Sequence, residues 1–170
     1  MKSSVVVAKH PLHPMLIPFP IGAFVFALIG DLAYLGTANT FWYAFATWSI
    51  GIGVITGLLA AVPGLIDFLT VVPGEARRTA STHMILNVSI VAVFAINLAL
   101  RAFSTATTGA NHWLTLALTI IADAALVYSG WLGGQLVYHY RIGIEERGQR
   151  EEARLRVTMS PEEARREQRR

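Results

Sequence analysis

Cysteine is absent from the 170 residues of this sequence. Its absence excludes disulfides, thiolate metal sites, cysteine-ligated iron–sulfur clusters and covalently attached c-type haem. The sequence also lacks the His-Glu-x-x-His pattern of zinc proteases, a phosphate-binding loop, a dinucleotide fingerprint and a serine in a nucleophile-elbow context. These absences favour a redox or accessory subunit over an enzyme.

Charge is scarce over most of the chain. Only seven charged residues lie between positions 15 and 140, whereas sixteen of the 25 lie in residues 141–170. The chain is 54% hydrophobic, and its mean hydropathy of +0.48 is high for a soluble protein. The net charge of +3 does not indicate a nucleic-acid partner, because the basic residues cluster beside apolar runs. The pattern predicts a membrane body followed by a water-soluble tail.

Four apolar runs reach the roughly 20 residues that a helix needs to span a bilayer. They are residues 15–35, 41–69, 83–103 and 113–138. The first run is longer than the core of a signal peptide, about 7–15 residues, so it is expected to stay as a membrane anchor. We predict an all-α polytopic membrane protein with a four-helix transmembrane bundle. Its parts are a lead-in (1–14), the bundle (15–140) and a charged, helical soluble tail (141–170).

Basic residues predict the orientation of this bundle. The N-terminus holds Lys2 and Lys9, the link between the second and third runs holds Arg77 and Arg78, and the tail holds nine arginines. The other two links contain no Lys or Arg. Cytoplasmic loops carry an excess of positive charge, so both termini and the middle link are expected in the cytoplasm.

Two histidines precede the first apolar run, and each stands directly before a proline, in His10-Pro11-Leu12-His13-Pro14. A residue before proline is disfavoured in the helical region. We therefore expect a stiff, extended and kinked lead-in whose prolines aim both imidazoles.

Depth along the helices predicts a histidine layer at the cytoplasmic edge. Its members come from distant parts of the chain: His10, His13, Asp67, His83 and His139. Asn87 lies one turn after His83, and Gln135 lies one turn before His139, so each is placed to orient an imidazole. Neutral imidazole is a ligand for haem iron, zinc, copper or non-haem iron. The alternative is that these histidines are solvated interfacial groups.

Within this layer, His83 and His139 lie at matching height and could hold a b-type haem. Arg77 or Arg78 would then lie near its propionates, and glycines of the second and fourth runs would leave room for a flat cofactor or allow close helix packing. His10 and His13 could ligate a second centre, or a mononuclear metal together with Asp67.

A second polar layer is predicted roughly 21–27 Å from the cytoplasmic edge, at about 1.5 Å per helical residue. Its members are Asp31, Asn97, Arg101 and Asp123. A buried ionisable group needs a partner, so Arg101 is expected to pair with Asp31 or Asp123. This layer reads either as a structural ion pair or as a proton or ion path. His112 is expected on the surface of the outer link.

Three blocks of the sequence resemble a bacterial family of four-helix membrane proteins known as domain of unknown function 2231. The blocks are His10-Pro11-x-His13-Pro14 with Phe19-Pro20-Ile21-Gly22, then Pro63-Gly64-x-x-Asp67 with Arg78 and His83-x-x-x-Asn87, then Gly133-Gly134-x-Leu136-Val137-Tyr138 with Ile142-Gly143-Ile144. The final turn departs mildly from the family's usual Gly-Val-Gly-Val type. The resemblance covers residues 8–145 and implies the bacterial cytoplasmic membrane. The family has no settled activity, but fusion of some members to Rieske-type iron–sulfur domains implies a redox setting.

Three hypotheses follow. The first is a membrane subunit that binds haem b or a metal and transfers electrons with a Rieske-type or cytochrome partner. The second is a proton or cation carrier, which would need a homo-oligomer because four helices make a small pore. The third is an accessory subunit whose tail holds a soluble partner.

Overall fold

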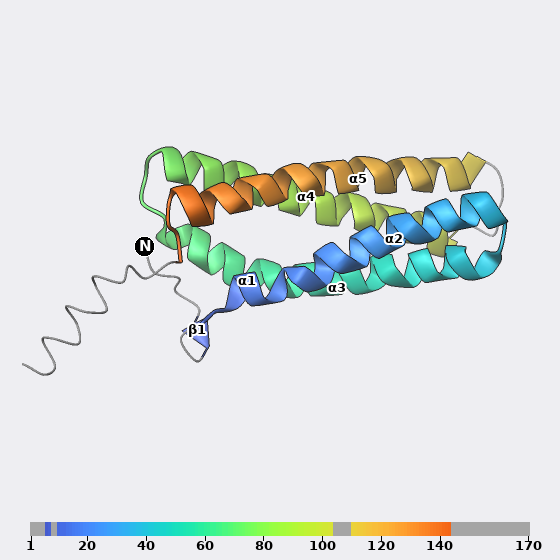
Figure 1. Ribbon diagram of the computed structural model, residues 1–170, viewed down its shortest axis with the longest axis horizontal. Coiled ribbons are helices and arrows are strands. Elements are labelled where there is room, and N and C mark those ends of the chain that lie inside the picture. The colour runs from blue at the N-terminus through green and yellow to red at the C-terminus, as the bar shows by residue number, and fades with distance from the viewer. Residues whose placement is uncertain (1–5, 8–9, 104–109, 144–170) are drawn as a thin grey trace, which may run out of the picture.

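The computed structural model describes residues 6–7, 10–103 and 110–143, and these residues form an elongated bundle of four long helices (Figure 1). The helices are α2 (Pro18–Thr37), α3 (Thr40–Thr70), α4 (Glu75–Phe103) and α5 (Ala110–Gly134). Four helical spans in the described part of the chain are long and apolar enough to cross a membrane. The predicted all-α, four-helix membrane fold is confirmed.

The helix that contains His83 begins earlier than its apolar run predicted. α4 starts at Glu75, so His83 lies two turns inside the helix and not at its first residue. Glu75 stands in the first turn, where a carboxylate is favourable beside the positive end of the helix dipole. Hydropathy alone could not include this polar first turn.

The lead-in is only partly extended. Strand β1 (Val6–Val7) pairs antiparallel with strand β2 (His10–Pro11), so His10 is extended as predicted. The prediction for His13 was wrong, because it lies in the short helix α1 (Leu12–Leu16). Pro14 stands in the first turn of α1, where its missing N–H has no helical partner to lose. Pro14 therefore costs α1 no backbone hydrogen bond, and His13 can be helical although a proline follows it.

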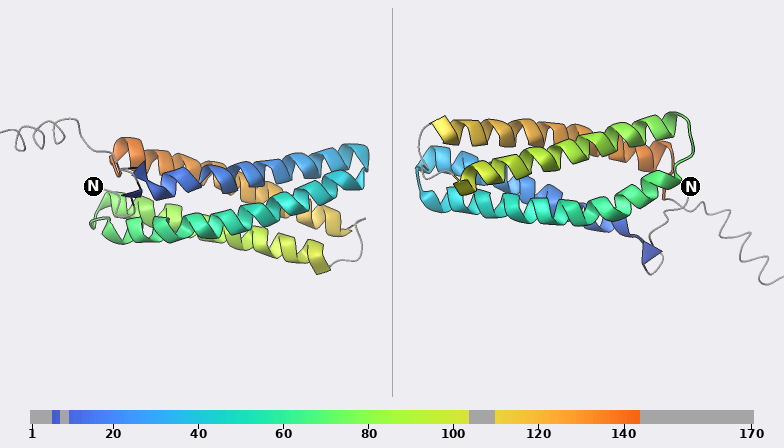
Figure 2. Two further views of the ribbon diagram at one scale, coloured as in Figure 1. Left: turned by 90° about the horizontal axis from the view of Figure 1, so that it is seen from below. Right: turned by 180° about the vertical axis from the view of Figure 1, so that it is seen from behind.

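The bundle has two polar ends, which are named here by their side chains. The histidine end holds α1, the link from α3 to α4, and the π-helical turn η1 (Gln135–His139) that follows α5 (Figure 1). The arginine end holds the turn from α2 to α3 and the last turn of α4, with Arg101. The views in Figure 2 agree that α2 lies beside α3 and that α4 lies beside α5. The predicted tail lies outside the described residues from position 144 onward.

An apolar core lies between the two ends. The rings of Phe24 and Phe94 stack with centroids 3.8 Å apart and an interplanar angle of 2°. The ring of Phe24 lies on Gly53 of α3, which has no side chain to obstruct it. Four further buried residues complete this core: Ala27, Ile50, Ile90 and Ala122.

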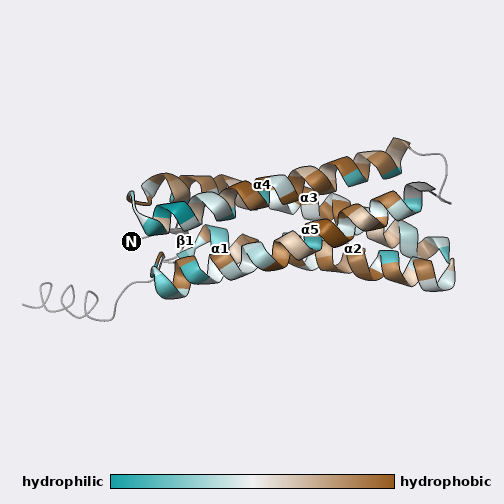
Figure 3. Cartoon of the chain, turned by 90° about the horizontal axis from the view of Figure 1, so that it is seen from above, coloured by the Kyte–Doolittle hydropathy of each residue, from teal (hydrophilic) through white to brown (hydrophobic). Residues whose placement is uncertain are grey.

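Hydrophobic residues, coloured brown in Figure 3, occur along all four long helices. Large side chains such as Ile55, Leu59 and Val127 are exposed along the helices. Soluble monomers rarely expose so many large apolar side chains side by side, whereas a bundle in lipid is expected to do so.

Candidate functional site

His13 packs against α3 at Ala60 and Gly64. Its Nδ1 is 2.8 Å from the carbonyl oxygen of Ala60, and its ring lies over Gly64. A Cβ on Gly64 would stand 2.8 Å from both Nδ1 and Cε1 of the imidazole, so glycine is required for this placement. Pro63 stands inside the helix beside Gly64, where a proline disturbs the regular backbone bonding. Because a carbonyl can only accept, Nδ1 carries the proton and Nε2 keeps its lone pair.

His83 is held in the same way by α5. Its Nδ1 is 2.9 Å from the carbonyl oxygen of Ser129, so this ring also donates from Nδ1 and keeps a lone pair on Nε2. Asn87 donates from Nδ2 to the His83 carbonyl and to the Ser129 hydroxyl, both at 2.8 Å, and lies 3.2 Å from Nε2. The ring lies over Gly133, where a Cβ would come within 3.2 Å of Cε1. The predicted orienting role of Asn87 is thus matched by a direct contact with the ring.

His13 and His83 lie within electrostatic reach of each other, although they come from different helices. Both rings are half-buried, both donate from Nδ1 to a main-chain carbonyl, and both keep a lone pair on Nε2, which in His83 faces Nδ2 of Asn87 at 3.2 Å. Metal-binding histidines have this arrangement, because the bond at one nitrogen fixes the tautomer and the ring plane for the other. The space over Gly64 and Gly133 is used by the two imidazoles themselves.

The other predicted ligands are placed differently. His139 is exposed at the end of η1, and its ring lies edge-on to Tyr140 with centroids 4.7 Å apart. His10 is exposed in β2, and Asp67 is half-buried near the end of α3. Within residues 6–7, 10–103 and 110–143, no group of three or more histidine or acidic side chains is close enough to hold a metal ion. Of the predicted ligands, His13 and His83 are the two whose Nδ1 atoms are held by main-chain carbonyls.

Arg77 closes the end of α3. Its Nη1 donates to the carbonyls of Phe68 at 2.7 Å and Val71 at 3.1 Å, and its guanidinium lies 3.8 Å above the Phe68 ring. The Phe68 carbonyl also accepts from the backbone N–H of Val71, so Arg77 adds a second bond there and a bond to the Val71 carbonyl at the end of α3. Arg78 is exposed. The predicted position of either arginine beside haem propionates stays a prediction.

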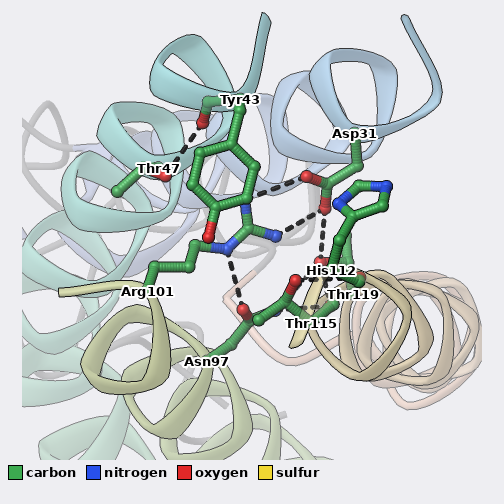
Figure 4. A network of polar contacts seen from close by, with 8 residues as sticks. All are labelled: Asp31, Tyr43, Thr47, Asn97, Arg101, His112, Thr115 and Thr119. Carbon is green, nitrogen blue, oxygen red and sulfur yellow. Dashed lines mark hydrogen bonds and ion pairs between the residues drawn. The ribbon is translucent and has the colours of Figure 1, made fainter. Parts of the chain in front are cut away.

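The arginine end contains a buried ion pair (Figure 4). Arg101 donates to both carboxylate oxygens of Asp31, at 2.9 and 2.7 Å, and both side chains are fully buried. Asn97 accepts from Nε of Arg101 at 2.9 Å, and Thr119 lies 2.9 Å from Asp31 Oδ2, to which its hydroxyl can donate. The prediction that Arg101 pairs with a buried aspartate is confirmed, and the partner is Asp31.

Two threonines of this network were missed by the sequence interpretation. Asn97 donates to the Thr115 carbonyl and to the Thr119 hydroxyl, both at 2.9 Å. Thr115, Thr119 and Asp123 recur every four residues and so share one face of α5, and this spacing is the signal that could have identified them.

Two buried side chains at this end make no hydrogen bond with the described part of the chain. Asp123 and His112 are each 7% exposed, and within the described residues none of their side-chain oxygens or nitrogens makes a hydrogen bond. The prediction that His112 lies on the surface was wrong. α5 begins at Ala110, so His112 is already helical, and its ring lies edge-on to Tyr34 with centroids 4.8 Å apart.

Comparison with known proteins identifies a family and no characterised relative. No curated protein and no solved structure matches the chain. The model of the family described as "Predicted membrane protein (DUF2231)" matches residues 9–146. This match covers both polar ends and all four spanning helices. The chain therefore belongs to this family of predicted membrane proteins, a domain family of unknown function.

Proposed function

We propose that this protein binds a metal centre, either haem b or a copper ion, through His13 and His83, and that it serves electron transfer within a membrane redox complex. The observation that supports the proposal is the matched pair of bonds from Nδ1 to the carbonyls of Ala60 and Ser129. These bonds leave an Nε2 lone pair on each imidazole, one from α1 and one from α4, and Asn87 would have to turn away from Nε2 of His83 for a metal to bind there.

Two imidazole ligands fit haem iron or copper better than zinc or non-haem iron. Haem iron takes its remaining four ligands from the porphyrin and asks the protein for two axial ones at most. Copper accepts imidazole readily and can be held by few protein ligands. Zinc and non-haem iron sites commonly use three or more protein ligands, which His13 and His83 alone do not supply. Haem b or copper would supply one-electron redox chemistry when bound.

The chain's own residues would fix the ligand geometry. The Ala60 and Ser129 carbonyls hold both rings in the tautomer that leaves Nε2 as the ligand atom. Asn87 restrains His83 through the bonds to its carbonyl and to the Ser129 hydroxyl. Partners of this kind are worth roughly 10- to 100-fold in metal affinity. Gly64 and Gly133 let both rings approach the helices that hold them.

Histidine variants test this proposal with a matched control. The full chain would be purified in detergent and titrated separately with haemin and with Cu⁺, and binding would be followed by absorbance and metal analysis. We expect one equivalent of one of these ligands per chain. His13→Ala and His83→Ala should each weaken binding by about 10-fold or more, because each removes a ligand atom. His139→Ala, at the same end but exposed, should bind like the wild type.

Two results would overturn the proposal. One is a wild-type protein that takes up neither haemin nor Cu⁺. The other is a loss in His139→Ala that equals the loss in His13→Ala, because it would return the site to the pair of His83 and His139 that depth alone suggested.

The proposed orientation places the histidine end in the cytoplasm of a bacterial cell, at the inner membrane. Of the four Lys or Arg residues in the described part of the chain, Arg77, Arg78 and Arg141 lie at this end, and Arg101 is buried at the other (Figure 1). Positive charge marks the cytoplasmic side.

A phosphatase that is active only outside the cytoplasm, fused to the C-terminus, should be silent. Strong activity of that fusion would reverse the orientation.

The remaining expectations stay predictions. A Rieske-type or cytochrome partner follows from the family resemblance alone. The partner-holding role of the tail concerns residues 144–170, which lie outside the described residues. A homo-oligomer was expected only for a carrier.

A further inference from the structure

The arginine end contains two ionisable side chains that the proposed metal centre does not use. Asp123 and His112 are both more than nine-tenths buried, and neither makes a hydrogen bond within the described residues. They lie on the same helix, with Thr115 and Thr119 between them on one face. At about 1.5 Å per residue, Asp123 is roughly 16 Å further along α5 than His112.

Asp123 makes no hydrogen bond to a positive side chain within the described residues. The guanidinium of Arg101 donates to both oxygens of Asp31 and to Asn97, and none of its N–H groups is bonded to Asp123. Asp31 also lies within electrostatic reach of Asp123, and two neighbouring carboxylates repel when both are charged. An ionised group within a bilayer costs at least about 2.5–3.5 kcal/mol on the insertion scale. A neutral, protonated Asp123 avoids this cost.

His112 is placed to exchange protons with this region. It begins the buried face of α5 at the arginine end, and it lies within electrostatic reach of Asp31 and Arg101. Its ring also faces Tyr34 of α2 and Tyr43 of α3, with centroids 4.8 and 6.2 Å away. Neither ring nitrogen makes a hydrogen bond, so the lone-pair nitrogen of the neutral ring is available for a proton.

We propose that Asp123 is a proton-binding site and that His112 is the group through which protons enter it from the arginine end. The transfer moves one proton and no electrons: an N–H bond of protonated His112 breaks, water molecules carry the proton over the roughly 16 Å between the two side chains, and an O–H bond of Asp123 forms. Thr119 lies one turn from Asp123, and its hydroxyl is within hydrogen-bonding distance of two alternative acceptors, Asp31 Oδ2 and the Thr115 carbonyl.

The route does not continue to the histidine end. Along α4, Phe94 and Ile90 separate Asn97 from Asn87, and both belong to the buried apolar core. On α5, Ala122 of the same core lies next to Asp123 in sequence. The stacked rings of Phe24 and Phe94 fill the centre of the bundle between the two polar ends, and among the described residues this core offers no polar side chain to a proton. Protons therefore reach and leave Asp123 on the arginine side.

Infrared spectroscopy tests both parts of the proposal on the full chain in lipid vesicles. The C=O stretch of a protonated carboxyl group should be present in the wild type, absent in Asp123→Asn, and shifted in Asp123→Glu. After transfer to D₂O, the rate at which this band shifts reports how fast its proton exchanges. His112→Phe keeps a ring against Tyr34 and should slow the exchange by about 100-fold, the low end of what a positioned proton donor contributes. His139→Phe, at the histidine end, should leave the rate unchanged.

Each part can fail separately. A band that survives in Asp123→Asn, or no protonated carboxyl band in the wild type, would overturn the site. Unchanged exchange in His112→Phe, with the band present, would overturn the entry route. Slower exchange in His139→Phe than in His112→Phe would place the entry at the histidine end and contradict the closed core.

Discussion

Replacing Asp31 with asparagine is expected to lower the free energy of unfolding by about 3–5 kcal/mol, because it leaves a buried guanidinium without its counter-charge. Arg101 and Asp31 are fully buried and joined by two hydrogen bonds. Asparagine keeps the size of the side chain, removes its charge and replaces one acceptor oxygen with an NH₂ donor. Unfolding of the purified protein in mixed micelles of increasing SDS content would measure the change.

Two further variants sharpen this test. Glu75→Gln removes a charge from an exposed acid in the first turn of α4, and its expected cost is below about 1 kcal/mol. The double variant Asp31→Leu with Arg101→Met removes both charges, and it should recover much of the stability lost in Asp31→Asn. A cost for Asp31→Asn no larger than that of Glu75→Gln would show that Arg101 finds another partner or reaches water.

Gly53→Ala is expected to destabilise the bundle by about 1–3 kcal/mol or more, because it overpacks the core. A Cβ at this position would stand 2.3 Å from Cε1 of Phe24, well inside contact distance. Phe24 cannot move aside easily, because its other face is stacked on Phe94. The same unfolding titration would measure the loss.

Gly51→Ala is the matched control for this substitution. It lies on the same helix, and the nearest side-chain atom to a Cβ there is 4.0 Å away. Alanine is a better helix former than glycine by up to about 1 kcal/mol, so this variant should be neutral or slightly stabilising. Equal losses in Gly51→Ala and Gly53→Ala would mean that the Phe24 contact does not limit the packing.

The membrane fold could be predicted from the sequence because it depends on length and hydropathy. Four apolar runs of spanning length leave no polar face for a globule, and four helices with short links can pack only side by side. The first residue of α4 is harder to predict from the sequence. Its polar first turn from Glu75 is helical through its end charge and its contacts, which hydropathy does not measure.

The pairing of side chains could be predicted only in part. Depth along the helices correctly placed Arg101 near two aspartates, but a rise per residue cannot say which aspartate faces the arginine. The same argument put His83 and His139 at one level, whereas rotation about the helix axis leaves His139 exposed. His13 was expected in an extended segment, and the helix α1 turns its ring onto Gly64 instead.

The glycines show why contacts were harder to predict than the fold. Small residues on a helix face indicate close approach but not what approaches. Here Gly53 accommodates a phenyl ring, while Gly64 and Gly133 accommodate imidazoles. The sequence could identify the space at these positions, and only the arrangement in three dimensions identifies its occupant.

The central claim is that His13 and His83 form one ligand site, and the most direct measurement is the absorption spectrum of the full-length protein purified from membranes. The spectrum would be recorded oxidised and then reduced with dithionite, with metal analysis on the same sample. We expect a Soret band with a reduced α band, or stoichiometric copper, and loss of that signal in His13→Ala. A colourless, metal-free protein that also takes up neither haemin nor Cu⁺ would contradict it.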